Sequence, residues 1–208
     1  MEKFDSGLEL AMISFLTIFI AYVPSIRTLS NLKEIELPIV TWVIFSLSSF
    51  VILFSSYSSG GLGLNLLAPF AGLIGSTTIM LLVLLKSKNR KVSFWDYLCG
   101  TLSIGALISW LVFLEDPERS KWVLVLSLVA NFFGLIPAIR NAWIKPHTDR
   151  PYLWFVFGLG YGLMLLVIPN WNLEYSLLPS YMFLGCIPVW LPLVIYRLNK
   201  KIPLKKWI

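Results

Sequence analysis

Tyr22-Val-Pro-Ser-Ile-Arg-Thr28, followed by Leu37-Pro38, is the most informative part of this chain because it occurs twice. The second copy is Gly134-Leu-Ile-Pro-Ala-Ile-Arg140, followed by Arg150-Pro151. A Pro-x-Ile-Arg sequence with a second proline at a fixed distance predicts an internal repeat, and a repeat determines the architecture. An ungapped shift of 113 residues aligns the copies, with identities that include Phe19 and Phe132, Pro24 and Pro137, Ile26 and Ile139, Arg27 and Arg140, Pro38 and Pro151, Gly72 and Gly185, and Ile74 and Ile187.

The composition of this 208-residue chain is typical of a membrane protein, with 57% hydrophobic and 13% charged residues. A soluble domain has about 25% charged residues. Apolar runs of roughly 20 residues recur along the chain, and each is long enough to cross a hydrocarbon core of about 30 Å. These features predict an all-α integral membrane protein whose outer faces contact the lipid bilayer.

Seven spans are predicted, and short polar connections separate them. Their ranges are 7–28, 37–57, 62–85, 95–114, 121–142, 151–169 and 175–197. When the connections are assigned to alternating sides, fourteen Lys and Arg residues fall on the side of the C-terminus and three on the other side. Because cytoplasmic loops carry the excess of Lys and Arg, we expect a multi-pass protein with its N-terminus outside and its C-terminus in the cytoplasm.

The repeat and the span count together predict the domain organisation. The 113-residue shift carries the first three spans onto the last three, and equivalent spans then cross the membrane in the same direction. Two parallel repeats need an odd helix between them, as in some transporters. We therefore expect a three-helix repeat over 1–90, a linker helix over 91–116, and a second three-helix repeat with a basic tail over 117–208.

The two proline-containing segments resemble the signature of the PQ-loop and SWEET-like (MtN3-type) transporter superfamily. The resemblance implies a seven-helix transporter in which Pro24, Pro38, Pro137 and Pro151 are the hinges of a gate. Those family members carry Gln next to the first proline of each copy, whereas this chain has Ser25 and Ala138 and contains no Gln. For Pro24 and Pro137, simple termination of the helix is the alternative to a gating role.

Substrate-binding candidates are polar or aromatic residues near the middle of spans, because transporter sites lie near the bilayer midplane at the repeat interface. Asn131 is the strongest, since a buried amide needs a partner or water. It lines a cavity or joins two helices, and the sequence leaves both open. The remaining candidates are Ser49, Thr77, Tyr161 and Trp190, the last as a surface on which a ring-shaped solute could stack.

No Asp, Glu, Lys, Arg or His lies in the middle of any predicted span. Ion-coupled transport normally needs such a group, so passive transport is expected. The only histidine is His147, and Cys99 and Cys186 have no metal or redox spacing, so neither a metal nor a cofactor is expected. No nucleophile has an oriented base, which argues against an enzyme and a catalytic residue. The net charge of +6 lies in connecting loops, which argues against a nucleic-acid partner.

The sequence therefore favours a membrane transporter, and in particular a facilitator (uniporter) that passes a small neutral or polar solute, such as a sugar, by alternating access. The alternative is a seven-helix membrane receptor, or a sorting or scaffold protein, on the same fold. The solute and the oligomeric state are not predicted.

Overall fold

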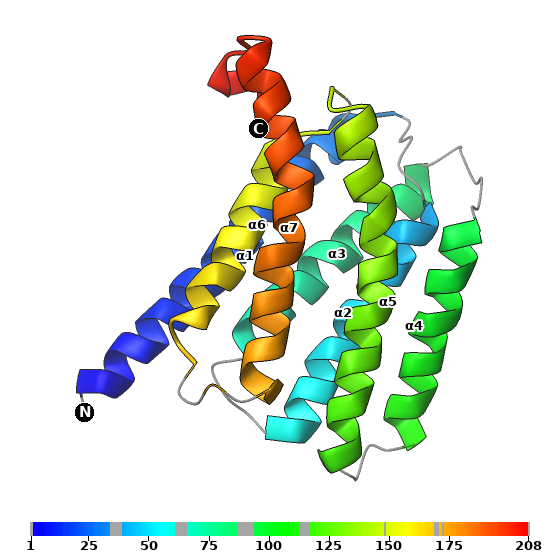
Figure 1. Ribbon diagram of the computed structural model, residues 1–208, viewed down its shortest axis with the longest axis vertical. Coiled ribbons are helices and arrows are strands. Elements are labelled where there is room, and N and C mark those ends of the chain that lie inside the picture. Colours follow the sequence, from blue (N-terminus) through cyan, green and yellow to red (C-terminus); the bar gives the residue numbers. More distant parts are fainter. Residues whose placement is uncertain are drawn as a thin grey trace.

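The computed structural model describes residues 2–33, 39–60, 66–86, 94–112, 117–147, 149–168, 171 and 173–207. Over these ranges the protein is all-helical, and each predicted span coincides with one α-helix (Figure 1). A short 3₁₀ helix, Leu204–Lys206, follows the last of them. The α-helices are α1 Glu2–Asn31, α2 Ile39–Gly60, α3 Leu67–Lys86, α4 Phe94–Val112, α5 Pro117–Ile144, α6 Pro151–Leu165 and α7 Leu173–Asn199.

Four of these helices are long and apolar enough to cross a membrane, which makes the chain a membrane-embedded helical protein. The apolar segments are Gly7–Asn31, Leu67–Lys86, Trp122–Ile144 and Tyr175–Asn199. Within the described residues, the apolar parts of α2, α4 and α6 are shorter. Large apolar side chains are exposed on the outside of the bundle, as expected for a surface that meets lipid tails. Leu85 is 81% exposed and Leu166 is 71% exposed.

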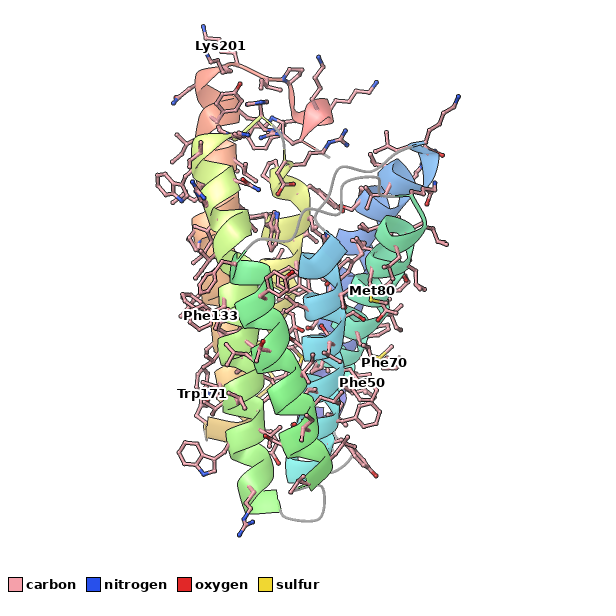
Figure 2. The ribbon with its side chains drawn as sticks, turned by 90° about the vertical axis from the view of Figure 1, so that its right-hand side faces the viewer. Phe50, Phe70, Met80, Phe133, Trp171 and Lys201 are labelled. Atoms are coloured by element: carbon pink, nitrogen blue, oxygen red, sulfur yellow. The ribbon has the colours of Figure 1, made fainter. Side chains whose placement is uncertain are left out.

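Successive helices run in opposite directions, so the two chain ends lie at opposite ends of the bundle (Figure 1). Here the C-terminal end means the end where α1, α3, α5 and α7 finish and α2, α4 and α6 begin. Lys201 lies at this end, and Trp171 at the opposite one (Figure 2). Arg27 and Arg140 lie four residues before the ends of α1 and α5, and Arg197 lies in the last turn of α7, so all three are near the C-terminal end.

We refer to α1–α3 and α5–α7, on either side of α4, as the first and second groups of helices. In the first, α3 contacts both α1 and α2, and in the second, α7 contacts both α5 and α6. The groups meet where α1 lies against α6 and α2 lies against α5. The remaining helix, α4, packs against α2 and α5.

Small residues let the two groups approach closely, as is usual where helices pack in membranes. Gly160 of α6 lies directly against Ile18 of α1, and the space that a Cβ would need is filled by that side chain. The hydroxyl of Ser14 donates a hydrogen bond of 2.7 Å to the carbonyl of Gly160, and Ser14 is fully buried. The contact between α1 and α6 is therefore close and includes a backbone-directed hydrogen bond.

The prolines occupy three kinds of position. Pro24 lies inside α1, which continues to Asn31, so the expectation that it might only end the helix is wrong. Pro137 falls within the bounds of α5, which continues to Ile144. Pro151 is the first residue of α6, after an extended Arg150, and Pro38 lies outside the described residues. Proline is ordinary at a first helical position, whereas Pro24 lies inside a helix, as do Pro179, Pro188 and Pro192 of α7.

Candidate functional site

A cavity of about 60 Å³ lies between the two groups of helices. Ligand pockets are commonly about 300–1,000 Å³, so in this conformation the cavity is closed down, and a small solute needs the helices to move apart. Side chains from six helices line it, with α4 excluded. They are Tyr22, Trp42, Phe45, Ser49, Ser76, Asn131, Leu135, Leu153, Trp154, Phe157, Tyr181, Met182, Gly185 and Cys186.

Two Trp-x-x-Phe pairs form much of the wall. Trp42 and Phe45 lie one turn apart on α2, with ring centroids 5.8 Å apart and perpendicular planes. Trp154 and Phe157 have the same spacing on α6, and both line the cavity. A spacing of three residues places both rings on one face of a helix. Each group of helices thus contributes one tryptophan and one phenylalanine from its second helix.

A close approach between α1 and α3 positions the third aromatic residue of the first group. The ring of Tyr22 occupies the space where Gly75 would carry a Cβ. The same ring meets Phe157 edge to face, with centroids 5.6 Å apart. Tyr22 therefore joins the first group of helices to the second at the cavity wall.

The polar part of the lining consists of uncharged groups that bond to one another. The hydroxyl of Tyr181 on α7 donates to Oδ1 of Asn131 on α5 at 3.0 Å. On the opposite wall, Ser76 of α3 donates a longer bond of 3.4 Å to Ser49 of α2. These groups could exchange their mutual hydrogen bonds for bonds to an uncharged polar solute, and they offer no fixed charge to an ion.

The two tryptophans lie nearer to the C-terminal end of the bundle than the polar groups do. At 1.5 Å per residue, Trp154 is about 5 Å from the start of α6, and Trp42 is equally close to the start of α2. Asn131 and Cys186 are about 20 Å before the ends of their helices. The cavity thus extends from two tryptophans near one end of the bundle to polar groups near its middle.

An acidic residue lies directly behind one of these tryptophans. Nε1 of Trp154 donates to Oδ2 of Asp149 at 2.9 Å, and the backbone N–H of Arg150 donates to Oδ1 at 2.6 Å. Burial raises the pKa of the Asp149 carboxyl above its usual value, and these two hydrogen bonds partly oppose that effect. Asp149 thus lies one hydrogen bond away from the cavity wall.

Arg197 of α7 holds the chain that carries Asp149. One of its terminal nitrogens donates to the carbonyl of Pro146 at 3.1 Å, and the other donates to the carbonyl of Asp149. Arg197 is only 5% exposed. The connection between α5 and α6 is therefore tied to α7 at one side and to a cavity-lining side chain at the other.

Of the five residues predicted to bind substrate, the structure places Asn131 and Ser49 on the cavity wall. The Thr77 hydroxyl instead bonds to Ser46 at 2.8 Å. Tyr161 is 2% exposed, and its hydroxyl donates weakly to the Ala68 carbonyl at 3.5 Å. Trp190 packs edge to face on Phe155, with centroids 5.4 Å apart. The last three lie away from the cavity lining, and their role in binding stays a prediction.

The sequence analysis did not single out Trp42, Phe45, Trp154, Phe157 or Tyr181, all of which line the cavity. A Trp-x-x-Phe follows the second proline of each copy, but at four residues from Pro38 and three from Pro151, so the 113-residue shift does not pair the two tryptophans. Tryptophan near a span end usually marks the membrane interface, so position alone did not distinguish these two. Among the described residues, no group of three His, Cys, Asp or Glu side chains could hold a metal ion.

No protein-family model matches the chain, and neither the curated proteins nor the solved structures contain a match to it.

Proposed function

We propose that the chain is a membrane transporter of the facilitator type, which passes a small neutral or polar solute through the central cavity by alternating access. The proposal includes seven spans arranged as two parallel three-helix repeats with α4 as the linker. It also includes a resemblance to the PQ-loop and SWEET-like superfamily, based on the two Pro-x-Ile-Arg segments at Pro24 and Pro137.

The pattern of helix contacts supports the two repeats. If α1, α2 and α3 are exchanged for α5, α6 and α7, the contacts of α3 with α1 and α2 become those of α7 with α5 and α6. The contact of α1 with α6 becomes that of α5 with α2, and the contact of α3 with α6 becomes that of α7 with α2. All of these contacts occur, so the packing has the symmetry that a duplication would produce.

Helix ends and buried residues support the same register. Asn31 ends α1 and Ile144 ends α5, and the separation is 113 residues. Lys86 ends α3 and Asn199 ends α7, with the same separation. The shift also aligns Ser14 with Ser127, and both are fully buried. The ends of the first and third helices of each half thus match the sequence shift, whereas the ends of α2 and α6 are 105 residues apart.

The distribution of charge favours a cytoplasmic C-terminal end. Arg27, Arg140 and Arg197 lie near this end, and exposed lysines follow in the tail at positions 200, 201, 205 and 206. Cytoplasmic loops carry the excess of Lys and Arg. The proposed orientation therefore has the N-terminus outside, and the Trp42 and Trp154 side of the cavity facing the cytoplasm.

The cavity is the single observation that carries the transport proposal. It lies between the two groups of helices, where a rocking motion of one repeat against the other would open it to either side. Its lining combines aromatic faces with the uncharged polar pair Tyr181 and Asn131. Such a lining suits a neutral solute that has both apolar faces and hydrogen-bonding groups.

A flux assay tests this proposal. The purified protein is reconstituted into proteoliposomes, and the uptake of uncharged sugars, amino acids and vitamins is compared with that of protein-free vesicles. We expect at least one compound to equilibrate faster, and Asn131→Leu to reduce that rate about tenfold. Thr78→Val is the matched control, because Thr78 bonds only to the Ile74 carbonyl of its own helix and does not line the cavity.

The assay also separates transport from the receptor and scaffold alternative. A receptor on this fold would bind a compound without moving it. If a compound binds in an Asn131-dependent way and no flux accompanies it over the whole screen, the receptor replaces the transporter as the proposed function.

A further inference from the structure

The cavity-lining residue Trp154 is held by a hydrogen bond to a residue that lies outside the helices. Its ring faces the cavity, and its Nε1–H donates to Asp149, which lies in the connection between α5 and α6. A hydrogen bond to a charged acceptor is stronger than one to a neutral acceptor. The indole is therefore held by its edge while its face closes part of the cavity.

The same connection is fixed to α7. Arg197 donates to the backbone carbonyls of Pro146 and Asp149 from a buried position near the end of α7. The connection continues directly into α6 through Arg150 and Pro151, so Arg197 ties the start of α6 to the end of α7. The bond between Asp149 and Trp154 adds a side-chain link within the same segment. These bonds form a series that runs from α7 through the connection to the Trp154 indole.

The position of the series gives it a role in access. Trp154 lies about 5 Å from the start of α6, and Cys186 lies against Gly158, one helical turn further along the same helix. Both Trp154 and Cys186 line the cavity. A molecule that enters from the C-terminal end must pass the level of Trp154 before it reaches Cys186. The series thus lies on the way into the cavity.

We infer that Asp149 is a positioning residue that holds the Trp154 indole across the C-terminal entrance of the cavity, with Arg197 fixing Asp149 to α7, so that the three form a latch. The latch rests on the proposed function, because it gives the cytoplasmic gate a residue that must be released before solute can pass. Opening requires the Trp154 ring to leave Asp149 or the connection to leave Arg197.

The native thiol of Cys186 is the reporter for the test. Cys99 is replaced by Ser, and the full chain is reconstituted in membranes with its C-terminal end accessible. A membrane-impermeant thiol reagent then labels Cys186 from that end. Trp154→Phe keeps the ring and removes the N–H donor, and Asp149→Leu removes the acceptor at similar size. Each variant should be labelled about tenfold faster than the parent, which corresponds to about 1.4 kcal/mol.

The double variant is the decisive comparison. If Asp149 acts through Trp154, the variant with both substitutions is labelled no faster than either single variant. Equal rates in the parent and both single variants would overturn the latch. So would an increase in only one of them, or a double variant whose effect is the product of the two.

Two controls keep the result unambiguous. Trp122→Phe removes an indole N–H at a surface position that is 71% exposed and should leave the labelling rate unchanged. A second reporter on the α2 wall is Ser49→Cys in a chain that also carries Cys186→Ala. If Asp149→Leu does not insert into the membrane, Asp149→Ala takes its place. If the Trp154 and Asp149 variants are labelled faster but no solute flux is found, the transport proposal is contradicted and the latch is not. If solute flux is found but the variants are labelled at the parent's rate, the latch is contradicted and the transport proposal is not.

Discussion

The hydroxyl of Tyr181 donates to Oδ1 of Asn131 at 3.0 Å and joins α7 to α5 inside the cavity. Asn131 is 7% exposed, so its amide oxygen has a protein partner whenever no solute is bound. This relationship satisfies both of the alternatives that the sequence left open for Asn131, because the residue lines a cavity and also joins two helices. The pair is stable in the empty cavity, and a solute has to compete with it.

Tyr181→Phe tests that competition. Hydrogen bonds between membrane helices are worth about 0.6 kcal/mol on average and up to about 1.7 kcal/mol, so we expect a loss of unfolding free energy in this range. The freed Asn131 oxygen should leave the affinity for a neutral solute the same or increase it. Asn131→Leu should weaken the same affinity. Thermal unfolding and solute binding on the purified variants measure both effects, and weaker binding by Tyr181→Phe would show that its hydroxyl contacts the solute itself.

Gly75→Ala is expected to displace the Tyr22 ring, because that ring fills the space of the new methyl group. Overpacking of this kind costs about 1–3 kcal/mol. Gly105→Ala on α4 is the matched control, since no neighbour lies within 4 Å of its added Cβ, and Ala is the better helix former by about 1 kcal/mol. Gly75→Ala should therefore unfold at a lower temperature than the parent, and Gly105→Ala at the same or a higher one. Equal losses in both variants would contradict the close contact of α1 with α3.

The raised pKa of Asp149 predicts a pH dependence of stability. Between an unfolded-state pKa of about 3.9 and the higher pKa in the folded protein, the folded state binds more protons than the unfolded state. The free energy of unfolding then falls as the pH rises through this window. His147 is exposed in the same connection. Unfolding temperatures from about pH 4 to pH 7 should decline more in the parent than in Asp149→Asn, and parallel curves would contradict a buried carboxyl.

Pro24→Ala and Pro137→Ala test the gating prolines. Each substitution restores a backbone N–H and removes a ring clash, which favours a straighter helix. Both variants should insert and fold, and exchange between inward-open and outward-open states should slow. Spin-label distances between Asn31 and Lys145, at the ends of α1 and after α5, report the two populations. Unchanged distances together with unchanged solute flux would show that these prolines have no part in a gate.

The sequence predicted the helices well because their signal is local. Apolar runs bounded by charged or glycine-rich connections determine where a membrane helix begins and ends. The largest shifts of a helix start are those of α1, which begins at Glu2 instead of residue 7, and α3, which begins at Leu67 instead of residue 62. The repeat register, which rests on Pro24 and Pro137, stays a prediction. Both predictions depend on composition along the chain and need no knowledge of which faces meet.

The cavity was only partly predictable because its lining depends on helix rotation. Asn131 and Ser49 were chosen only because they lie near the middle of predicted spans, and both line the cavity. Trp190 was chosen for the same reason, but it packs on Phe155 instead. The contact of Asp149 with Trp154 was not predicted, since a side-chain hydrogen bond of this kind cannot be seen in the sequence. The 113-residue shift does align Asp149 with Glu36, so an acidic residue precedes the proline in both copies, and this was the available signal.

Two-sided access to Cys186 tests the central claim of alternating access most directly. In a chain with Cys99→Ser, a membrane-impermeant thiol reagent is applied from the N-terminal side alone and then from the C-terminal side alone, and the labelled fraction is followed with time. The thiol lines the cavity between the two groups of helices, so the account predicts slow but complete labelling from either side. Labelling that goes to completion from one side and never begins from the other would contradict it.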